Sequence, residues 1–234
     1  MLGTASRTLF VVQADPPAGR VEEFQRWYDE VHGPDALKMG SFTRMCRYRA
    51  VGPGQATAPF LALWEGNYAD EAQAWGYIRP RAHKLNDSGR VGDIASPRFA
   101  LMTFLVNASG GPGPRPRALT TVQNDWREAA GAAPAEAWWK KAGLDAAPAS
   151  IARFLYTSDP AGKGAGYHLA IFEQDCSPAE AAKAWAQVGA PGSSPAPAYR
   201  TIFTDPNAPV AEIQDARPRA EAWVMHWEPL TVQP

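Results

Sequence analysis

Apolar and polar residues follow one another in the first half of the chain in a pattern that predicts four strands and two helices. Four segments rich in β-branched and aromatic residues are bounded by Gly, Pro or Asp, as strands are. They span 8–13, 42–51, 59–65 and 97–106. Helical spacing of apolar residues predicts helices over 19–32 and 70–77, the second continuing toward residue 85 unless Pro80 ends it. The order β-α-β-β-α-β is the ferredoxin-like arrangement.

The first predicted helix carries most of the candidate chemistry. At about 100° per residue, one apolar stripe consists of Phe24, Trp27, Tyr28 and Val31. His32 falls at the edge of this stripe on the last turn, and Gly33-Pro34 is expected to end the helix. The imidazole is therefore expected where the buried face meets solvent.

A Gly- and Pro-rich linker at 109–117 leads to a second half in which five short sequence matches return in the same order. They pair 11–15 with 121–125, 27–28 with 138–139, 60–65 with 168–173, 71–75 with 181–185, and 99–106 with 222–228. We predict an α+β fold of two tandem ferredoxin-like domains, 1–108 and 118–234, forming a dimeric-α+β-barrel-like arrangement within one chain. The insertion at 189–219 is expected to be a lid, an interface or a disordered loop.

The two halves differ at the end of the first helix. Aligning Trp27-Tyr28 on Trp138-Trp139 sets Gly143 opposite His32, and two lysines opposite residues 29–30. The second copy thus lacks the titratable cluster. This favours a site in the first half and a degenerate second half, although ordinary drift gives the same difference.

Composition and charge exclude several partners. The net charge is −1 without a basic run, so neither nucleic acid nor an anionic membrane is expected to bind. No apolar run approaches the roughly 20 residues of a membrane span and no secretory leader is visible, so we expect a cytoplasmic protein, of bacterial type by its Ala, Gly, Pro and Arg content. Cys46 and Cys176 are predicted to be free, buried thiols, and no His or Cys spacing suggests a metal.

The segment Trp27-Tyr28 to His32 and Pro34, followed by a turn and a strand, resembles the W-Y-x-x-x-H-x-P signature of the EthD-like branch of the dimeric α+β barrel superfamily. The resemblance implies similarity to small cofactor-free enzymes acting on aromatic or polyketide-like compounds: cyclases, lactone isomerases and quinone-forming monooxygenases. The superfamily also includes haem-binding branches and members of unknown activity. Fold alone does not choose among them.

His32 is the candidate general acid or base, because a histidine exchanges protons near pH 7. Tyr28, one turn earlier, is the candidate hydrogen-bond donor. Asp35 is preferred over Asp29 as the carboxylate that orients the imidazole, because Asp29 points away from the stripe. The alternative is that His32 only complements the dipole at a helix C-terminus.

Candidate substrate-binding residues lie in the helix and the sheet. One of Arg44 and Arg47, which alternate on the strand, would face the cleft and bind an enolate oxygen. An aromatic wall for a planar substrate would be formed by Tyr48, Trp64, Trp75 and Tyr77, and Trp27 is a further substrate-binding candidate. The alternative is that these aromatic side chains only fill the core and the arginines are solvated.

The hypothesis that follows is a cofactor-independent lyase, isomerase or cyclase acting on a small aromatic or carbonyl compound by histidine acid/base catalysis. The alternatives are a cofactor-free monooxygenase of the same fold, a non-catalytic small-molecule-binding or stress-related module, and haem binding. We expect no cofactor and no metal, and leave open whether the chain forms a homo-oligomer.

Overall fold

The computed structural model describes residues 8–14, 16–51, 59–68, 73–74, 76–78, 80–81, 84, 94, 100–105, 117–126, 151–157, 166–187 and 222–233. The predicted helix around 138–139, nearly all of the linker at 109–117 and the insertion at 189–219 lie outside these residues, as does Gly143.

The first half contains four strands and a long interrupted helix that follows the first strand. Its elements are β1 (Thr8–Ala14), α1 (Val21–Trp27), the π-helical η1 (Tyr28–His32), α2 (Gly33–Lys38), β2 (Arg44–Val51), β3 (Phe60–Gly66) and β4 (Ala100–Leu105). The four predicted strands are confirmed. The described residues between 73 and 84 are helical, on both sides of Pro80.

The second half repeats the pattern of strands. Its elements are β5 (Ala118–Trp126), β6 (Ile151–Thr157), β7 (Gly166–Gln174), α5 (Pro178–Gln187) and β8 (Ala222–Gln233). Ser177 caps α5, since its hydroxyl accepts from the Glu180 backbone N–H at 3.3 Å while the Glu180 carboxylate accepts from the Ser177 N–H at 2.8 Å.

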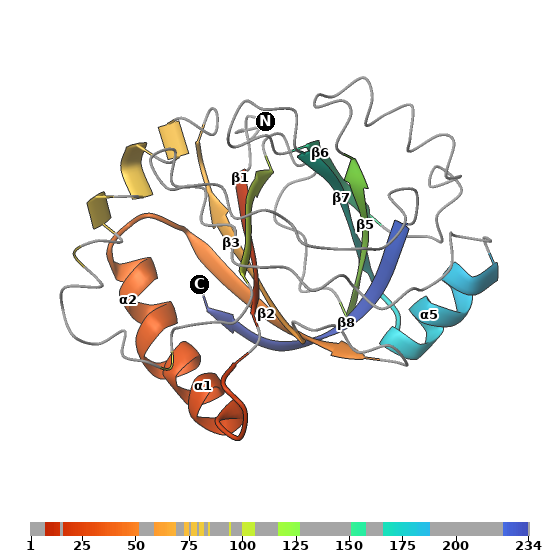
Figure 1. Cartoon of the computed structure of the whole chain (residues 1–234), viewed down its shortest axis with the longest axis horizontal. Helices are drawn as coiled ribbons and strands as arrows, with labels where there is room; N and C mark the ends of the chain where they lie inside the picture. Colours follow the sequence, from red (N-terminus) through yellow and green to blue (C-terminus); the bar gives the residue numbers. More distant parts are fainter. Residues whose placement is uncertain are drawn as a thin grey trace.

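One eight-stranded sheet holds both halves together, in the order β4-β1-β3-β2-β8-β5-β7-β6. Every neighbouring pair is antiparallel. Within each half, the strands numbered in chain order lie side by side as 4-1-3-2. This is the ferredoxin-like strand order. The sheet curls until its outer strands β4 and β6 lie in contact (Figure 1). The predicted α+β fold class is confirmed.

The strand β8 joins the two halves. Its first part pairs with β5 and its later part with β2, and Trp227 stands opposite Leu119 in one ladder and Ala50 in the other. Trp227 is fully buried, and its Nε1 donates to Thr121 Oγ1 at 2.9 Å. One residue of β8 thus belongs to the strand ladders of both halves, and its side chain bonds to β5.

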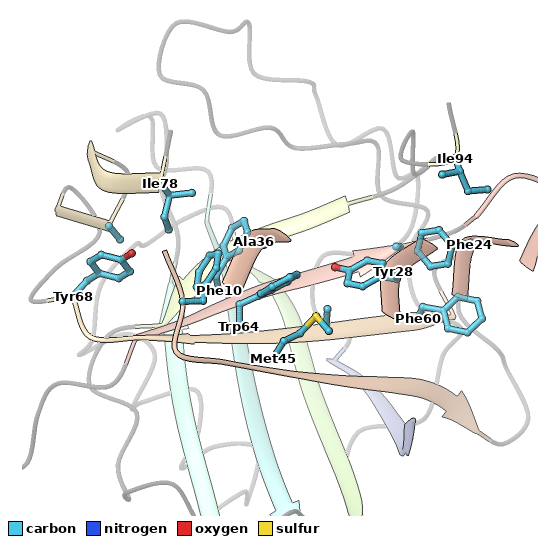
Figure 2. Packing of buried hydrophobic residues seen from close by; sticks show 14 residues of the cluster. Phe10, Phe24, Tyr28, Ala36, Met45, Phe60, Trp64, Tyr68, Ile78 and Ile94 are labelled. Atoms are coloured by element: carbon cyan, nitrogen blue, oxygen red, sulfur yellow. The ribbon is translucent and has the colours of Figure 1, made fainter. Parts of the chain in front are cut away.

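The α1–η1–α2 segment covers one face of the first half of the sheet. The buried residues beneath it include Phe10, Phe24, Tyr28, Met45 and Trp64 (Figure 2). The apolar stripe of the sequence supplies the helical part of this cluster, because Phe24 and Tyr28 fall on one side of the helix.

Phe42 belongs to the same cluster, contrary to the alternation expected for 42–51. Its ring stacks on Phe10 with centroids 5.8 Å apart and meets Trp64 at 5.1 Å. The strand begins only at Arg44, so Phe42 lies before it. The alternation of strand side chains between the two faces therefore does not apply to Phe42.

Candidate functional site

The helix that carries His32 does not end at Gly33-Pro34, so that expectation is wrong. Gly33 keeps right-handed helical angles, and its N–H bonds to the Tyr28 carbonyl five residues earlier. The helix continues as α2 to Lys38, with Met39 as its C-cap. Gly40 follows with a φ of +72°, the left-handed conformation common just after a helix. Pro34 is tolerated because a widened π-turn precedes it, where a regular helix would bring its ring against the carbonyl four residues earlier.

The π-turn determines what His32 contacts. In a regular α-helix, residues five apart point about 140° away from each other. Here the His32 ring stacks on Trp27, five residues earlier, with centroids 4.5 Å apart and planes 13° apart. It also meets Tyr28 edge to face at 4.9 Å. The widened turn thus brings both aromatic neighbours to one imidazole.

Trp64 on β3 completes what we call the aromatic box: Trp27, Tyr28, His32 and Trp64. The Trp64 ring lies 5.6 Å from His32 and 6.1 Å from Tyr28. The box is built by two elements, since the helix provides three rings and the sheet provides the fourth. Three of these residues are the predicted candidates Trp27, Tyr28 and Trp64 around His32.

His32 is neutral in this setting. Its pKa is lowered to about 4, mainly by burial; the charge of Asp35 acts in the opposite direction, and the charge of Arg47 adds to the lowering. Its Nδ1 is fully shielded and has no hydrogen-bond partner among the described residues. A buried ring nitrogen without a partner is uncommon, because desolvating a polar atom disfavours folding.

Tyr28 is protonated at neutral pH. Burial raises its pKa to about 12, although the charge of Arg47 and a hydrogen bond with Trp64 act in the opposite direction. An indole nitrogen can only donate, so the Tyr28 oxygen accepts this bond and keeps its own proton for another acceptor. The box therefore combines a neutral imidazole with a phenol that can donate.

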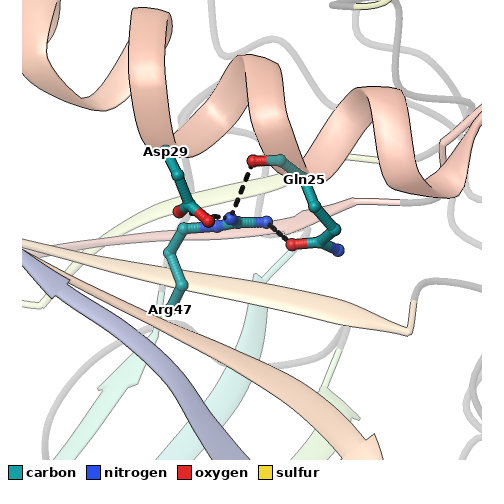
Figure 3. A network of polar contacts seen from close by, with 3 residues as sticks. All are labelled: Gln25, Asp29 and Arg47. Atoms are coloured by element: carbon teal, nitrogen blue, oxygen red, sulfur yellow. Dashed lines mark hydrogen bonds and ion pairs between the residues drawn. The ribbon is translucent and has the colours of Figure 1, made fainter.

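Arg47 and Asp29 form an ion pair that joins the helix to β2 (Figure 3). Arg47 Nη1 lies 2.6 Å from Asp29 Oδ1 and 3.4 Å from the Gln25 carbonyl, and Nη2 donates to Gln25 Oε1. The guanidinium also lies 4.3 Å from the centre of the Tyr28 ring. Arg47, which is 2% exposed, thus fixes the helix on the sheet, and Asp29 is engaged there.

Asp35 lies in the first turn of α2, and not in a turn after the helix as expected. It is half-buried and raises the pKa of His32 by its charge. Of the two carboxylates considered, Asp35 acts on the imidazole by its charge, and Asp29 forms an ion pair with Arg47.

Arg44 and Tyr48 lie on the other face of the sheet. Arg47 stands opposite Ala62, and Ala62 belongs to the cluster beneath the helix. On β2, the side chains of Arg44 and Tyr48 point to the face opposite to that of Arg47. Arg44 Nη1 lies 3.8 Å from Glu65 Oε1. Burial raises the pKa of Tyr48, with Cys46 and Glu173 adding to the effect. These two candidates are therefore not part of the aromatic box. Trp75 lies outside the described residues.

Gln25 was missed by the sequence analysis. Its Oε1 accepts from Arg47 while its Nε2 is buried without a hydrogen-bond partner among the described residues. Gln25 lies four residues before Asp29, so both side chains are on the same face of the helix. Two such polar residues opposite a strand that carries an arginine are the sequence signal from which Gln25 could have been predicted as a partner of Arg47.

Within the described residues, no three His, Cys, Asp or Glu side chains are placed to hold a metal. Neither Cys46 nor Cys176 is in a disulfide; Cys46 is buried, as predicted, whereas Cys176 is half-buried, so the prediction of a buried thiol is wrong there. None of the described helices has the length and apolar character of a membrane span.

The solved structures found to resemble this chain include distant likenesses. No family model and no curated protein matches the chain. A solved structure described as a putative chlorite dismutase has a TM-score of 0.45 and 9% identity, covering 97% of this chain and 95% of that one. A variant chlorite dismutase from Candidatus Nitrospira defluvii has a TM-score of 0.39 and 12% identity, covering 96% and 91%. With TM-scores below 0.5, these likenesses assign neither a family nor an activity.

Proposed function

We propose that the first half binds a small aromatic or carbonyl compound at the aromatic box and transfers a proton with His32. The chain would be a cofactor-independent enzyme of the lyase, isomerase or cyclase type. The observation that carries the proposal is the buried Nδ1 of His32, which lacks a partner among the described residues in a box of three further aromatic rings.

The proposed step is removal of a proton from the carbon beside a carbonyl group. The proton moves to His32 Nδ1, and the enolate oxygen accepts a hydrogen bond from Tyr28. A pKa of about 4 makes His32 a weak base before a substrate binds. The negative charge that develops on the substrate would stabilise the imidazolium beside it, so the base is strengthened only as the reaction proceeds. Return of the proton to another carbon gives an isomer, and loss of a leaving group gives an elimination product.

The charges around the box favour an uncharged substrate. Arg47 is the cation nearest to Tyr28, and its guanidinium is engaged by Asp29 and Gln25. We therefore assign Arg47 the role of positioning the helix, in place of the enolate binding expected from the sequence. The aromatic walls suit a planar ligand.

Proton exchange in D₂O tests this proposal whatever product the reaction yields. Aryl ketones and lactones would be incubated with the full chain, and deuterium at the carbon beside the carbonyl would be followed by NMR. We expect His32→Ala to reduce exchange roughly 10²–10⁴-fold, the usual contribution of a general base. Tyr28→Phe should reduce it by a smaller factor. Arg49→Met, a surface change on β2, serves as the control.

The same samples separate the alternative functions. Oxygen consumption together with the His32-dependent exchange would identify a monooxygenase. Saturable ligand shifts at His32 without exchange would identify a binding module. If no compound moves the His32 signal and its pKa is near the unperturbed value of about 6.5, the proposal fails and a structural helix histidine remains.

We also propose an EthD-like ancestry on the motif from Trp27 to Pro34, and a tandem duplication on the five sequence matches and the shared strand order. A cytoplasmic location stays a prediction that fractionation would test, and light scattering would answer the open question of a homo-oligomer.

A further inference from the structure

A second group of buried polar residues lies in the second half of the sheet. In the strand register, Thr120 on β5 stands between Phe172 on β7 and His226 on β8. In the first half, Phe10 on β1 has the equivalent place, because its register neighbours are Trp64 on β3 and Phe104 on β4. The strand order is the same in both halves, so a threonine and a histidine occupy the positions of two phenylalanines.

The hydrogen bonds of this group define the state of His226. The buried Thr120 hydroxyl donates to Gln174 Oε1 at 2.6 Å. A hydroxyl has one proton, so at its 3.0 Å contact with His226 Nδ1 the imidazole is the donor. Burial lowers the pKa of His226 to about 4, and the ring is neutral at pH 7. A neutral ring protonated at Nδ1 presents a lone pair at Nε2.

Trp185 on α5 supplies a donor on the same side of the sheet. It is 1% exposed, and its Nε1 is buried without a hydrogen-bond partner among the described residues. Its ring meets Phe172 at 4.6 Å, and Phe172 is the register neighbour of Thr120. The indole therefore covers the strand next to the polar group. A ligand or a water is a suitable acceptor for such a buried N–H.

We propose that the α5 side of the second half is a separate binding site for a small neutral planar molecule with both a donor and an acceptor, such as a carboxamide. The ligand N–H would donate to His226 Nε2, and its carbonyl oxygen would accept from Trp185 Nε1. Phe172 offers an aromatic surface. Thr120, Gln174 and a neutral His226 carry no charge, and a buried ligand charge without a partner would be disfavoured. This site does not depend on the function proposed for the first half.

Benzamide is the probe, with benzoate and toluene as the charged and the purely apolar comparison. In ¹H–¹⁵N spectra of the full chain, we expect benzamide to shift the His226 and Trp185 side-chain signals saturably. Benzoate and toluene should bind at least tenfold more weakly. Trp185→Phe and His226→Phe should each weaken benzamide binding at least tenfold, while Arg49→Met should leave it unchanged.

Spectra of the unmodified chain decide the outcome even if a variant fails to fold. A His226 proton on Nε2, unmoved signals up to the solubility of benzamide, or tighter binding of benzoate would each overturn the proposal. The polar group would then be a structural network. Signals of His32 are separate in the same spectra, so failure here and failure of the proposed enzyme site are distinguishable.

Discussion

Burial, more than any paired charge, sets the protonation state of His32. Its pKa is about 4 in the folded chain, against about 6.5 for an unperturbed imidazole. As the pH falls, the unfolded chain therefore takes up the proton first. The free energy of unfolding should decrease between about pH 6.5 and pH 4, by at most about 3 kcal/mol for this one ring.

His32→Phe should remove this part of the pH dependence, because phenylalanine keeps the ring stacking and cannot be protonated. Urea unfolding at pH 7 and at pH 5 would measure it. His226 remains in the variant with a pKa of about 4, so a smaller slope should persist. A slope unchanged by the substitution would show that His32 titrates normally in the folded chain.

Arg47 and Arg49 lie on one strand and differ in burial. Arg47→Met would leave Asp29 and Gln25 without their buried partner, and we expect a loss of about 2–4 kcal/mol in the free energy of unfolding. Arg49→Met breaks an ion pair with Glu228 in which the Arg49 side chain is 56% exposed, and should change stability by less than about 1 kcal/mol. Equal losses in urea unfolding would mean that the Arg47 network adds nothing beyond a surface pair.

Among the elements, the four strands of the first half followed from the sequence and the end of the first helix did not. A strand is marked by a local pattern of apolar residues between turn residues. This pattern can be recognised from the sequence alone, without knowing what the strand packs against. Gly33-Pro34 is an equally local stop signal, but it was overridden here because the π-turn makes room for the proline and the apolar stripe continues to Ala36 and Leu37 in the core. Tertiary packing decided this position.

The same reasoning explains which site residues could be predicted. Trp27, Tyr28 and His32 follow from spacing along one helix, so the sequence places them together. The pairing of Arg47 with Asp29 depends on how the helix lies on the strand, which no local pattern encodes. Trp64 was named as a candidate wall residue, but its place next to His32 also depends on that docking.

Gly40 is where the long helix stops, and it is expected to resist substitution. Its φ of +72° lies in the left-handed region, which an alanine adopts only with strain. We expect Gly40→Ala to lower the free energy of unfolding by about 1 kcal/mol. Gly76→Ala is the matched control, because Gly76 is exposed in a helical stretch with nothing within 4 Å of an added Cβ. Thermal unfolding should show that control unchanged or stabilised; a loss at both positions would point to an effect other than φ.

For the whole molecule, Trp227 is expected to couple the two halves. It is fully buried and belongs to the ladders with both β2 and β5. Trp227→Ala should cost about 3–5 kcal/mol and separate the unfolding of the halves into two transitions, visible when circular dichroism and fluorescence no longer coincide. Trp64→Ala removes a similarly buried indole from the first half only. It should destabilise the chain, but the circular dichroism and fluorescence transitions should still coincide.

The shared strand order of the halves was foreseen from the internal sequence matches, whereas the junction was not. Nothing in the sequence of β2 distinguishes pairing with β8 from pairing with another edge strand. That choice is made by which edges remain open once each half has formed its own four strands.

The junction also has a consequence for the order of events during synthesis. The free edge of β2 leaves the ribosome early, but its partner β8 is made only after everything between Val51 and Ala222. Until then the N-terminal half presents a strand edge whose backbone N–H and C=O groups lack their final partners. A nascent chain of this design is exposed to pairing with a neighbouring nascent chain, and slow translation of the second half would prolong that exposure.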